Sequence, residues 1–401
     1  MAAAGADDRC SRHPGAAAAD FQGLSSVAAF AEYAVLKFRK WFWPIVAGLA
    51  LIGCRTAPDR APAPIIEVVQ LPDLKPPVLG QGRVETNLPP PILPPAPPPV
   101  AAFRWPTNSA HPGWIALETW SALNQLRAPQ RRRPGLETFF TVSTPQGAVT
   151  LQIGSRIAHW DGRPCWLGYA PQLFNGQPHL ALVDAAKTLQ PLLAPVPPVT
   201  RTNRVIVLDP GHGGADNGTS GAQRQLEKEL ALDWALRVQA LLRTNGWKVV
   251  LTRTTDTNVP LAARVVAADL ANADLFVSLH FNSGHPNLTH AGIETYCLTP
   301  TGLPSSLTRN FEDNPRLVFP NNLFDRENLQ FAFRLQRELV RATQANDGGV
   351  RRARFMGVLR GQNRPAVLIE GGYLSNPAEA RLIATAAYRQ KLAEAVARAL
   401  E

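Results

Sequence analysis

Cysteine is scarce in this chain. Cys10, Cys54, Cys165 and Cys297 lie far apart among 401 residues, and no two of them form a CxxC pair. A disulfide framework and a cysteine-based zinc finger both need regularly spaced cysteines, so neither is predicted. A single Cys165–Cys297 bridge remains open, because the sequence does not determine which distant residues meet.

The chain also lacks any basic run interleaved with stacking aromatic residues, although its formal net charge is +10 at pH 7. Arginines scattered along the chain carry most of this charge. The pattern gives no support to nucleic-acid binding. A basic surface suits an anionic polymer such as a cell wall, or a lipid headgroup layer, and it equally fits a generally solvated surface.

The N-terminal region has no apolar run of the roughly 20 residues that a membrane-spanning helix needs. Its apolar stretch covers only residues 41–52, follows basic residues at 37, 39 and 40, and ends in Leu51-Ile52-Gly53-Cys54. These features are typical of a secretory signal. The last four residues resemble a bacterial lipobox, which implies that Cys54 is lipidated and anchors the chain to a membrane. An uncleaved helix is the alternative.

We therefore assign residues 1–54 to a signal and lipobox segment, with a doubtful extension before Lys37. By analogy with bacterial lipoproteins, Arg55 in place of aspartate favours the outer membrane, with the protein facing the periplasm. Residues 55–104 form a linker whose fourteen prolines between Pro58 and Pro99 favour an extended, semi-rigid spacer. A ligand for a proline-recognising module is the sharper alternative.

Residues 105–194 are expected to form a small, mostly-β accessory domain. Short alternating segments within 138–167 are separated by turn signals such as Asp161-Gly162, and Asn175-Gly176 follows them, a pattern typical of hairpins. Residues 114–126 have helical spacing. Residues 156–178 resemble part of the stalk-like domain of copper amine oxidases, without a chemical motif. We interpret the domain as a stalk or a wall-positioning module.

From residue 201 to 401 the pattern changes to alternating strands and helices. Strands are expected over 205–208, 247–252, 274–279, 293–298, 356–359 and 366–369. Helices are expected over 226–243, 261–270 and 329–344, with two more at the C-terminus. This alternation predicts an α/β domain with a twisted, largely parallel sheet flanked by helices.

Four polar residues stand where these elements begin or end: His212, Glu227, His280 and Glu370. Because the carboxyl ends of parallel strands share one edge, and ligands bind there, these residues are expected to converge. Two imidazoles and one carboxylate are the ligands of a catalytic zinc, and a further carboxylate serves as general base. Singly, each has an ordinary explanation, but a buried acid such as Glu370 at the end of an apolar strand needs a reason.

Six stretches in the last 200 residues or so resemble, in order, the zinc-dependent N-acetylmuramoyl-L-alanine amidase family (amidase type 3). They are 206–214 (IVLDPGHGG), 226–229 (LEKE), 251–254 (LTRT), 278–283 (SLHFNS), 292–296 (GIETY) and 368–376 (LIEGGYLSN). The resemblance implies that His212, Glu227 and His280 bind one Zn²⁺ and that Glu370 is the catalytic glutamate. It also implies the substrate, the amide bond between N-acetylmuramic acid and L-alanine in peptidoglycan.

Several choices accompany this prediction. Glu227 is favoured over Glu229 as a ligand, and His285 and His290 rank below His280. Phe281 stands where the family has a small residue, which would narrow the cleft. Asn282 and Arg264 are candidate substrate-binding residues.

The insertion at 299–327 is long for a connection without secondary structure. It is expected to be either a lid over the zinc, on which a protein activator acts, or a plain surface loop.

Two other functions remain open at this point. One is a zinc carboxypeptidase or another amidohydrolase acting on wall peptides, which would use the same ligand set. The other is an inactive lipoprotein that binds peptidoglycan. The presence of all four predicted site residues favours the enzyme.

Overall fold

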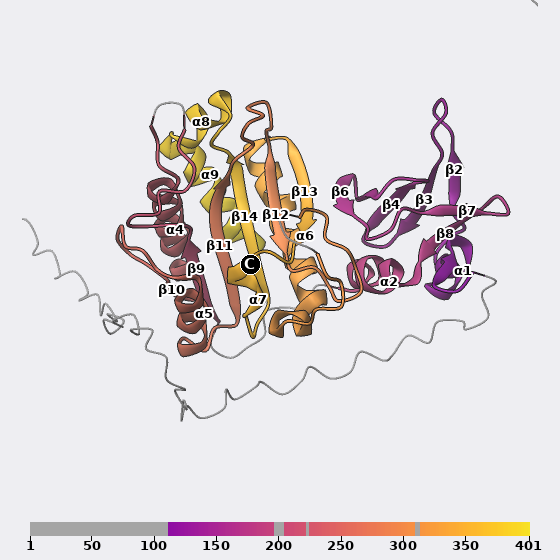
Figure 1. Cartoon of the computed structure of the whole chain (residues 1–401), viewed down its shortest axis with the longest axis horizontal. Coiled ribbons are helices and arrows are strands. Elements are labelled where there is room, and N and C mark those ends of the chain that lie inside the picture. The colour runs from indigo at the N-terminus through magenta and orange to yellow at the C-terminus, as the bar shows by residue number, and fades with distance from the viewer. Residues whose placement is uncertain (1–110, 196–203, 222–223, 309–312) are drawn as a thin grey trace, which may run out of the picture. The chain divides into compact units, whose positions relative to one another are not determined.

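The computed structural model describes residues 111–195, 204–221, 224–308 and 313–401 (Figure 1). The predictions for the signal segment, for Cys54 and for the proline-rich linker therefore lie outside the described residues. Within the described ranges, no helix combines the length and the apolar character needed to cross a membrane.

The C-terminal region is built on a sheet with the strand order β10-β9-β11-β14-β12-β13 (Figure 1). The strands β10, β9, β11 and β14 are parallel, β12 is antiparallel to β14, and β13 is parallel to β12. Their bounds are β9 Val205–Pro210, β10 Lys248–Leu251, β11 Leu275–Asn282, β12 Ile293–Cys297, β13 Asp347–Arg352 and β14 Ala366–Tyr373. Every residue of β9 and β14 is buried, as expected for strands covered on both faces. The predicted α/β fold with a largely parallel sheet is confirmed.

Helices cover both faces of this sheet. Three long helices, α4 (Glu227–Thr244), α6 (Asp325–Thr343) and α9 (Ala386–Ala399), pack together on one face, where Trp234 and Leu392 join the larger hydrophobic core. The shorter α5 (Leu261–Leu270) and α7 (Gly357–Arg360) lie against the other face, over a smaller core that contains Leu368. The remaining elements are a 3₁₀ turn, Pro320–Phe324, and α8, Pro377–Ile383.

Residues 111–195 form a small unit with two sets of strands. The strands β1 (Trp114–Ala116), β8 (Gln177–Ala181) and β7 (Gln172–Phe174) make a three-stranded antiparallel sheet, and α1 spans Leu117–Leu123. Antiparallel neighbours follow one another in the second set, β2 (Gln130–Arg132), β3 (Phe139–Thr144), β4 (Gly147–Gln152), β5 (Ile157–Trp160) and β6 (Arg163–Trp166). Three short helical pieces follow: Leu182–Asp184 (α2), Ala185–Leu189 (η1) and Gln190–Leu193 (α3).

The small unit and the C-terminal region share one sheet. Cys165 of β6 pairs with Val350 of β13 in parallel, which extends the sheet to eleven strands within the described residues. Arg163 also forms an ion pair with Asp347, at 3.0 Å. The accessory unit is therefore attached to the rest of the chain by backbone pairing as well as by side chains.

One predicted strand was wrong. Residues 356–359 do not form a strand, because Gly357–Arg360 is the helix α7. The strand next to β12 is Asp347–Arg352 instead, a polar, glycine-containing segment. A four-residue apolar run is compatible with either state, and here its side chains pack under the sheet as a helical turn.

Cys165 and Cys297 are both buried and free, so the disulfide that had been left open does not form. Burial raises the pKa of Cys165 to about 12 and that of Cys297 to about 11. Both thiols therefore stay protonated and behave as small core residues.

Candidate metal centre

The loop that carries His212 begins at the buried end of β9. There the Asp209 carboxylate accepts hydrogen bonds from Thr252 Oγ1 at 2.6 Å and from Ser278 Oγ at 2.7 Å, and it pairs with Arg264 Nη1 at 2.7 Å. These partners satisfy a buried charge that would otherwise be costly. Asp209 therefore fixes the point from which the loop starts.

Two buried arginines hold the backbone of this loop. Arg264 Nη2 donates to the carbonyl of His212 at 2.8 Å, and Arg253 Nη2 donates to the carbonyl of Gly211 at 2.7 Å. Arg264 is only 4 % exposed and also donates to the carbonyls of Val259 and Pro210. These contacts make Arg264 part of the loop's support, and its contact with substrate stays a prediction.

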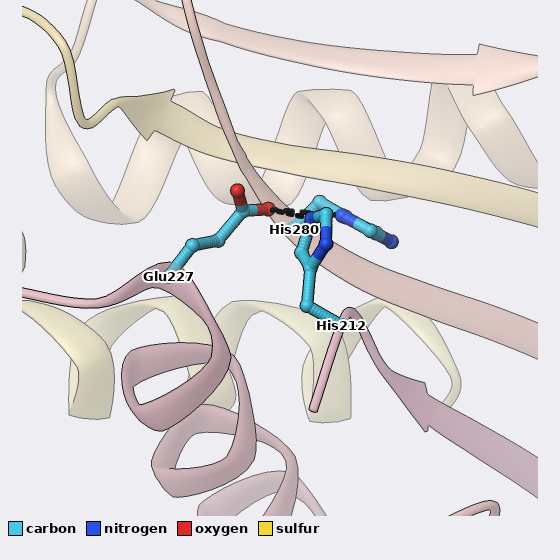
Figure 2. Close-up of side chains that lie close together, drawn as sticks. All are labelled: His212, Glu227 and His280. Carbon is cyan, nitrogen blue, oxygen red and sulfur yellow. Dashed lines mark hydrogen bonds and ion pairs between the residues drawn. The ribbon is translucent and has the colours of Figure 1, made fainter. Parts of the chain in front are cut away.

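His212, Glu227 and His280 converge at the carboxyl edge of the parallel strands, as Figure 2 shows. Nε2 of His212 lies 3.1 Å and Nδ1 of His280 lies 2.9 Å from the same oxygen, Oε1 of Glu227. Ligands bound to one zinc at about 2.0–2.1 Å stand roughly 3.3 Å apart in tetrahedral geometry. The donor types and their spacing therefore fit a zinc ion.

Two glycines make room for this arrangement. A Cβ on Gly211 would lie 2.3 Å from the His280 ring. A Cβ on Gly218 would lie 2.6 Å from both Glu227 Oε2 and the His212 ring, and Gly218 has a φ of +65° that side-chain-bearing residues rarely adopt. The backbone is thus shaped to let the three side chains meet.

Glu227 is the first residue of α4 and is almost fully buried. The backbone N–H of Phe281 donates to its Oε1 at 3.0 Å, and the N–H of Thr219 donates to its Oε2 at 2.8 Å. Burial opposes ionisation, but the hydrogen bonds and charges of His212 and His280 hold the pKa of Glu227 far below its usual value. The carboxylate is therefore charged at all working pH values, as a metal ligand must be.

Asp216, which the sequence analysis did not single out, orients His212. Its Oδ2 lies 2.8 Å from His212 Nδ1, and this contact leaves Nε2 directed at Glu227. Although partial burial would raise the pKa of Asp216, hydrogen bonds from His212 and from the Gly218 N–H lower it. A carboxylate on the outer nitrogen of a ligating histidine fixes its tautomer and raises its basicity. The sequence offered one signal for this role, because Asp216 is a carboxylate four residues after the predicted ligand His212 and in the same loop.

We predict that Asp216→Asn weakens zinc binding about 10- to 100-fold, because His212 loses the charged acceptor that orients its ring. Titration of the metal against a competing chelator measures this change. Asp256→Asn is the matched control, since Asp256 accepts from Gly214 N at 2.7 Å and touches no ligand. An equal loss in both variants would show that loop stability is responsible, rather than the orientation of His212.

Glu370 lies next to His280, on the neighbouring strand and on the same face of the sheet. In the strand register, His280 stands opposite Glu370, and Glu370 stands opposite Glu294. Glu370 is 7 % exposed. The neighbouring Glu294 carboxylate pairs with Arg351 Nη2 at 2.7 Å and accepts from Asn282 Nδ2 at 3.0 Å. Asn282 is therefore bound to this network, and its role in substrate binding stays a prediction.

The structure separates the competing candidates. Glu229 is exposed on α4, whereas Glu227 faces the two histidines. His285 and His290 are exposed, and neither belongs to the convergent group found among the described residues. The expectation that Phe281 narrows the cleft was wrong: its ring packs on Trp234 of α4, on the opposite face of the sheet.

The insertion begins at the edge of the sheet opposite to the carboxyl edge where the metal centre lies, and its described residues are 299–308 and 313–327. It follows the C-terminal end of β12, and because β12 is antiparallel to β14, it leaves the sheet at the edge where β14 begins. Arg354 anchors its described residues through Asp313 at 2.6 Å and the carbonyl of Pro300 at 2.8 Å. A lid over the metal is therefore the wrong interpretation, and an activator that acts on this segment remains a prediction.

Fold and site together define a metal-dependent hydrolase, with two histidines, one buried carboxylate ligand and a further glutamate at the edge of a largely parallel sheet. A model of the N-acetylmuramoyl-L-alanine amidase family matches residues 206–401. The amidase AmiA of Salmonella typhimurium is 31% identical over 252 residues, which cover 57% of this chain and 86% of that protein. AmiA of Escherichia coli is 33% identical over 215 residues, which cover 48% of this chain and 74% of that protein. This chain belongs to the N-acetylmuramoyl-L-alanine amidase family.

Among solved structures, the chain is similar to the catalytic domain of CwlV, an N-acetylmuramoyl-L-alanine amidase from Bacillus (Paenibacillus) polymyxa var. colistinus. The sequence identity is 31% and the TM-score is 0.41, with 49% of this chain and 96% of that domain covered.

Proposed function

We propose that this chain hydrolyses the amide bond between N-acetylmuramic acid and the L-alanine of the stem peptide in peptidoglycan. The observation that carries the proposal is the convergence of His212, Glu227 and His280 on one point, with Glu370 next to His280 in the strand register. The family supplies the bond, because the geometry alone would serve any amide.

His212, Glu227 and His280 would hold one zinc ion. When bound there, zinc supplies the Lewis acidity that polarises a carbonyl and makes a water acidic near neutral pH. Glu370 accepts the proton of the water that attacks the amide carbon. The same carboxyl group then returns the proton to the leaving nitrogen, so it is unchanged after one turnover.

The neighbours of Glu370 support this role. Glu294 stands opposite it in the strand register. Arg351 pairs with Glu294 and lies over the ring of Trp166, 3.7 Å from its centroid. The carboxylate next to Glu370 is therefore already paired with a cation, which leaves Glu370 as the carboxylate beside His280 that is available to accept a proton.

We predict that the chain releases intact stem peptides with a free L-alanine amino group from purified peptidoglycan. Mass spectrometry of the soluble products measures this. A carboxypeptidase would release free amino acids instead, and an inactive binding protein would release nothing, so either product pattern would contradict the proposal.

A cell-wall amidase works outside the cytoplasm. We further infer that lipidation of Cys54 anchors the chain to the outer membrane, facing the periplasm, with the proline-rich segment 55–104 as a spacer. The short apolar segment that ends in Leu-Ile-Gly-Cys supports this inference. Detergent partitioning of cell membranes tests it, because a Cys54→Ala chain that still fractionates with the outer membrane would contradict it.

A further inference from the structure

A cleft of about 440 Å³ opens between the small unit and α6. Trp160 and Leu192 of the small unit and Phe333 of α6 give it apolar walls. The long helices α4, α6 and α9 cover this face of the sheet, whereas Glu370 projects from the other face together with Leu368. The cleft is therefore separate from the metal centre.

Polar atoms in the wall of this cleft lack partners among the described residues. Gln330 donates through Nε2 to the carbonyl of Pro191 at 2.8 Å, but its buried Oε1 has no hydrogen-bond partner. Arg163 pairs through Nη1 with Asp347, but its buried Nε has none. Buried polar groups in native proteins are almost always satisfied, so the wall of the cleft keeps two unused hydrogen-bonding atoms, each of which is covered from solvent.

The charge balance of the cleft points the same way. Three arginines line it, and two of them are already paired, Arg163 with Asp347 and Arg337 with Glu338. Within the described part of the chain, Arg334 forms no hydrogen bond or ion pair. Burial and the charge of Arg337 lower the pKa of Arg334, and the carboxylates of Glu338 and Glu401 only oppose this in part. An anion in the cleft would give Arg334 a partner of opposite charge.

The ligand must meet three requirements at once. Guanidinium groups favour a carboxylate or a phosphate. The aromatic walls favour an apolar part, and the unused oxygen of Gln330 favours an N–H donor if its side chain turns toward the ligand. The C-terminal end of a short peptide has a carboxylate, an amide N–H and a side chain close together. Inorganic phosphate meets only the first requirement.

We propose that this cleft binds the terminal carboxylate of a wall stem peptide and is a second peptide site, distinct from the metal centre. The choice of a wall peptide as its source rests on the amidase function proposed above. Trp160, Arg163 and Leu192 lie outside the segment that the family model matches, so the small unit contributes this site. The unit would hold one stem peptide while another is cleaved.

The test compares the full chain with Arg334→Met and with Arg341→Met. Arg341 lies on the same helix, its side chain is 76 % exposed, and it lies outside the cleft, so it is a matched control. Calorimetry measures binding of a synthetic stem tetrapeptide and of its C-terminal amide. The metal is first removed with a chelator, so that the metal centre contributes little.

We expect Arg334→Met to weaken tetrapeptide binding about tenfold or more, as loss of a charged hydrogen-bond partner does, and Arg341→Met to leave it unchanged. The amidated peptide should bind the parent chain as weakly as the free peptide binds Arg334→Met. With metal restored, Arg334→Met should raise KM for intact peptidoglycan and leave hydrolysis of a soluble muramoyl peptide unchanged. Arg337→Met, at an exposed position, gives a second variant if Arg334→Met is unstable, with a smaller loss expected.

Equal binding of the free and amidated peptides would overturn the proposal, as would displacement by inorganic phosphate at the same concentration or no binding to the parent chain. The same measurements distinguish a failure of this proposal from a failure of the proposed amidase function. If the chain binds the tetrapeptide through Arg334 but releases no stem peptides, the peptide site is supported and the amidase function is wrong. If it releases stem peptides but does not bind the tetrapeptide through Arg334, the amidase function is supported and the peptide site is wrong.

Discussion

Replacing Glu370 with glutamine should lower hydrolysis about 10²- to 10⁴-fold, the range that general acid–base catalysis contributes. Glutamine has nearly the same shape but cannot accept the proton of the attacking water. Zinc content should stay the same, because Glu370 is not one of the three residues that converge on the metal position. Turnover of a soluble muramoyl peptide and elemental analysis of the purified variant measure the two effects.

Glu229→Gln is the control for this variant, because it makes the same chemical change at an exposed position near the same site. It should keep both zinc and activity. If Glu370→Gln retained normal turnover, another group would have to accept the proton, and the mechanism proposed here would be wrong. If Glu370→Gln lost its zinc, Glu370 would be a ligand rather than a base.

The convergence of the metal centre was predictable because it follows from strand direction. Parallel strands end at one edge, so residues after β9 and at the end of β11 had to lie near each other. Strand direction alone does not predict which side chain orients a ligand. Asp216 reaches His212 through a tight loop with positive φ values at His212, Gly213 and Gly214, and no periodic pattern predicts such a loop.

The position of the insertion was not predictable for a related reason. The sequence pattern of β12 indicates a strand but not its direction, and an antiparallel strand sends the following segment to the opposite edge. A parallel β12 would have directed the segment that follows it to the carboxyl edge, where the metal centre lies. The incorrect lid interpretation thus depended on the direction of a single strand.

The role of the small unit depends on pairings between distant segments. Strand β6 pairs with β13 although about 185 residues separate Cys165 from Val350. The polar sequence of β13 becomes a strand because both of its neighbours offer backbone partners. The cleft against α6 results from this pairing, so neither the cleft nor the strand could be predicted from local patterns.

Replacing His280 with alanine should abolish specific zinc binding and reduce hydrolysis to that of the chelator-treated parent chain. A ligand is lost here, so the fall in affinity should far exceed the roughly 10- to 100-fold expected when only an orienting residue is removed. The thermal shift with zinc is a second measurement, because a metal at about 1,000 times its Kd stabilises the folded state by about 4 kcal/mol. The parent chain should gain this stability and His280→Ala should not.

His285→Ala is the control, because His285 is an exposed histidine five residues further on, and this variant should behave as the parent does. If His280→Ala bound zinc as tightly as the parent, the ion would lie elsewhere, and the convergence of His212, Glu227 and His280 would be only a buried hydrogen-bonded cluster.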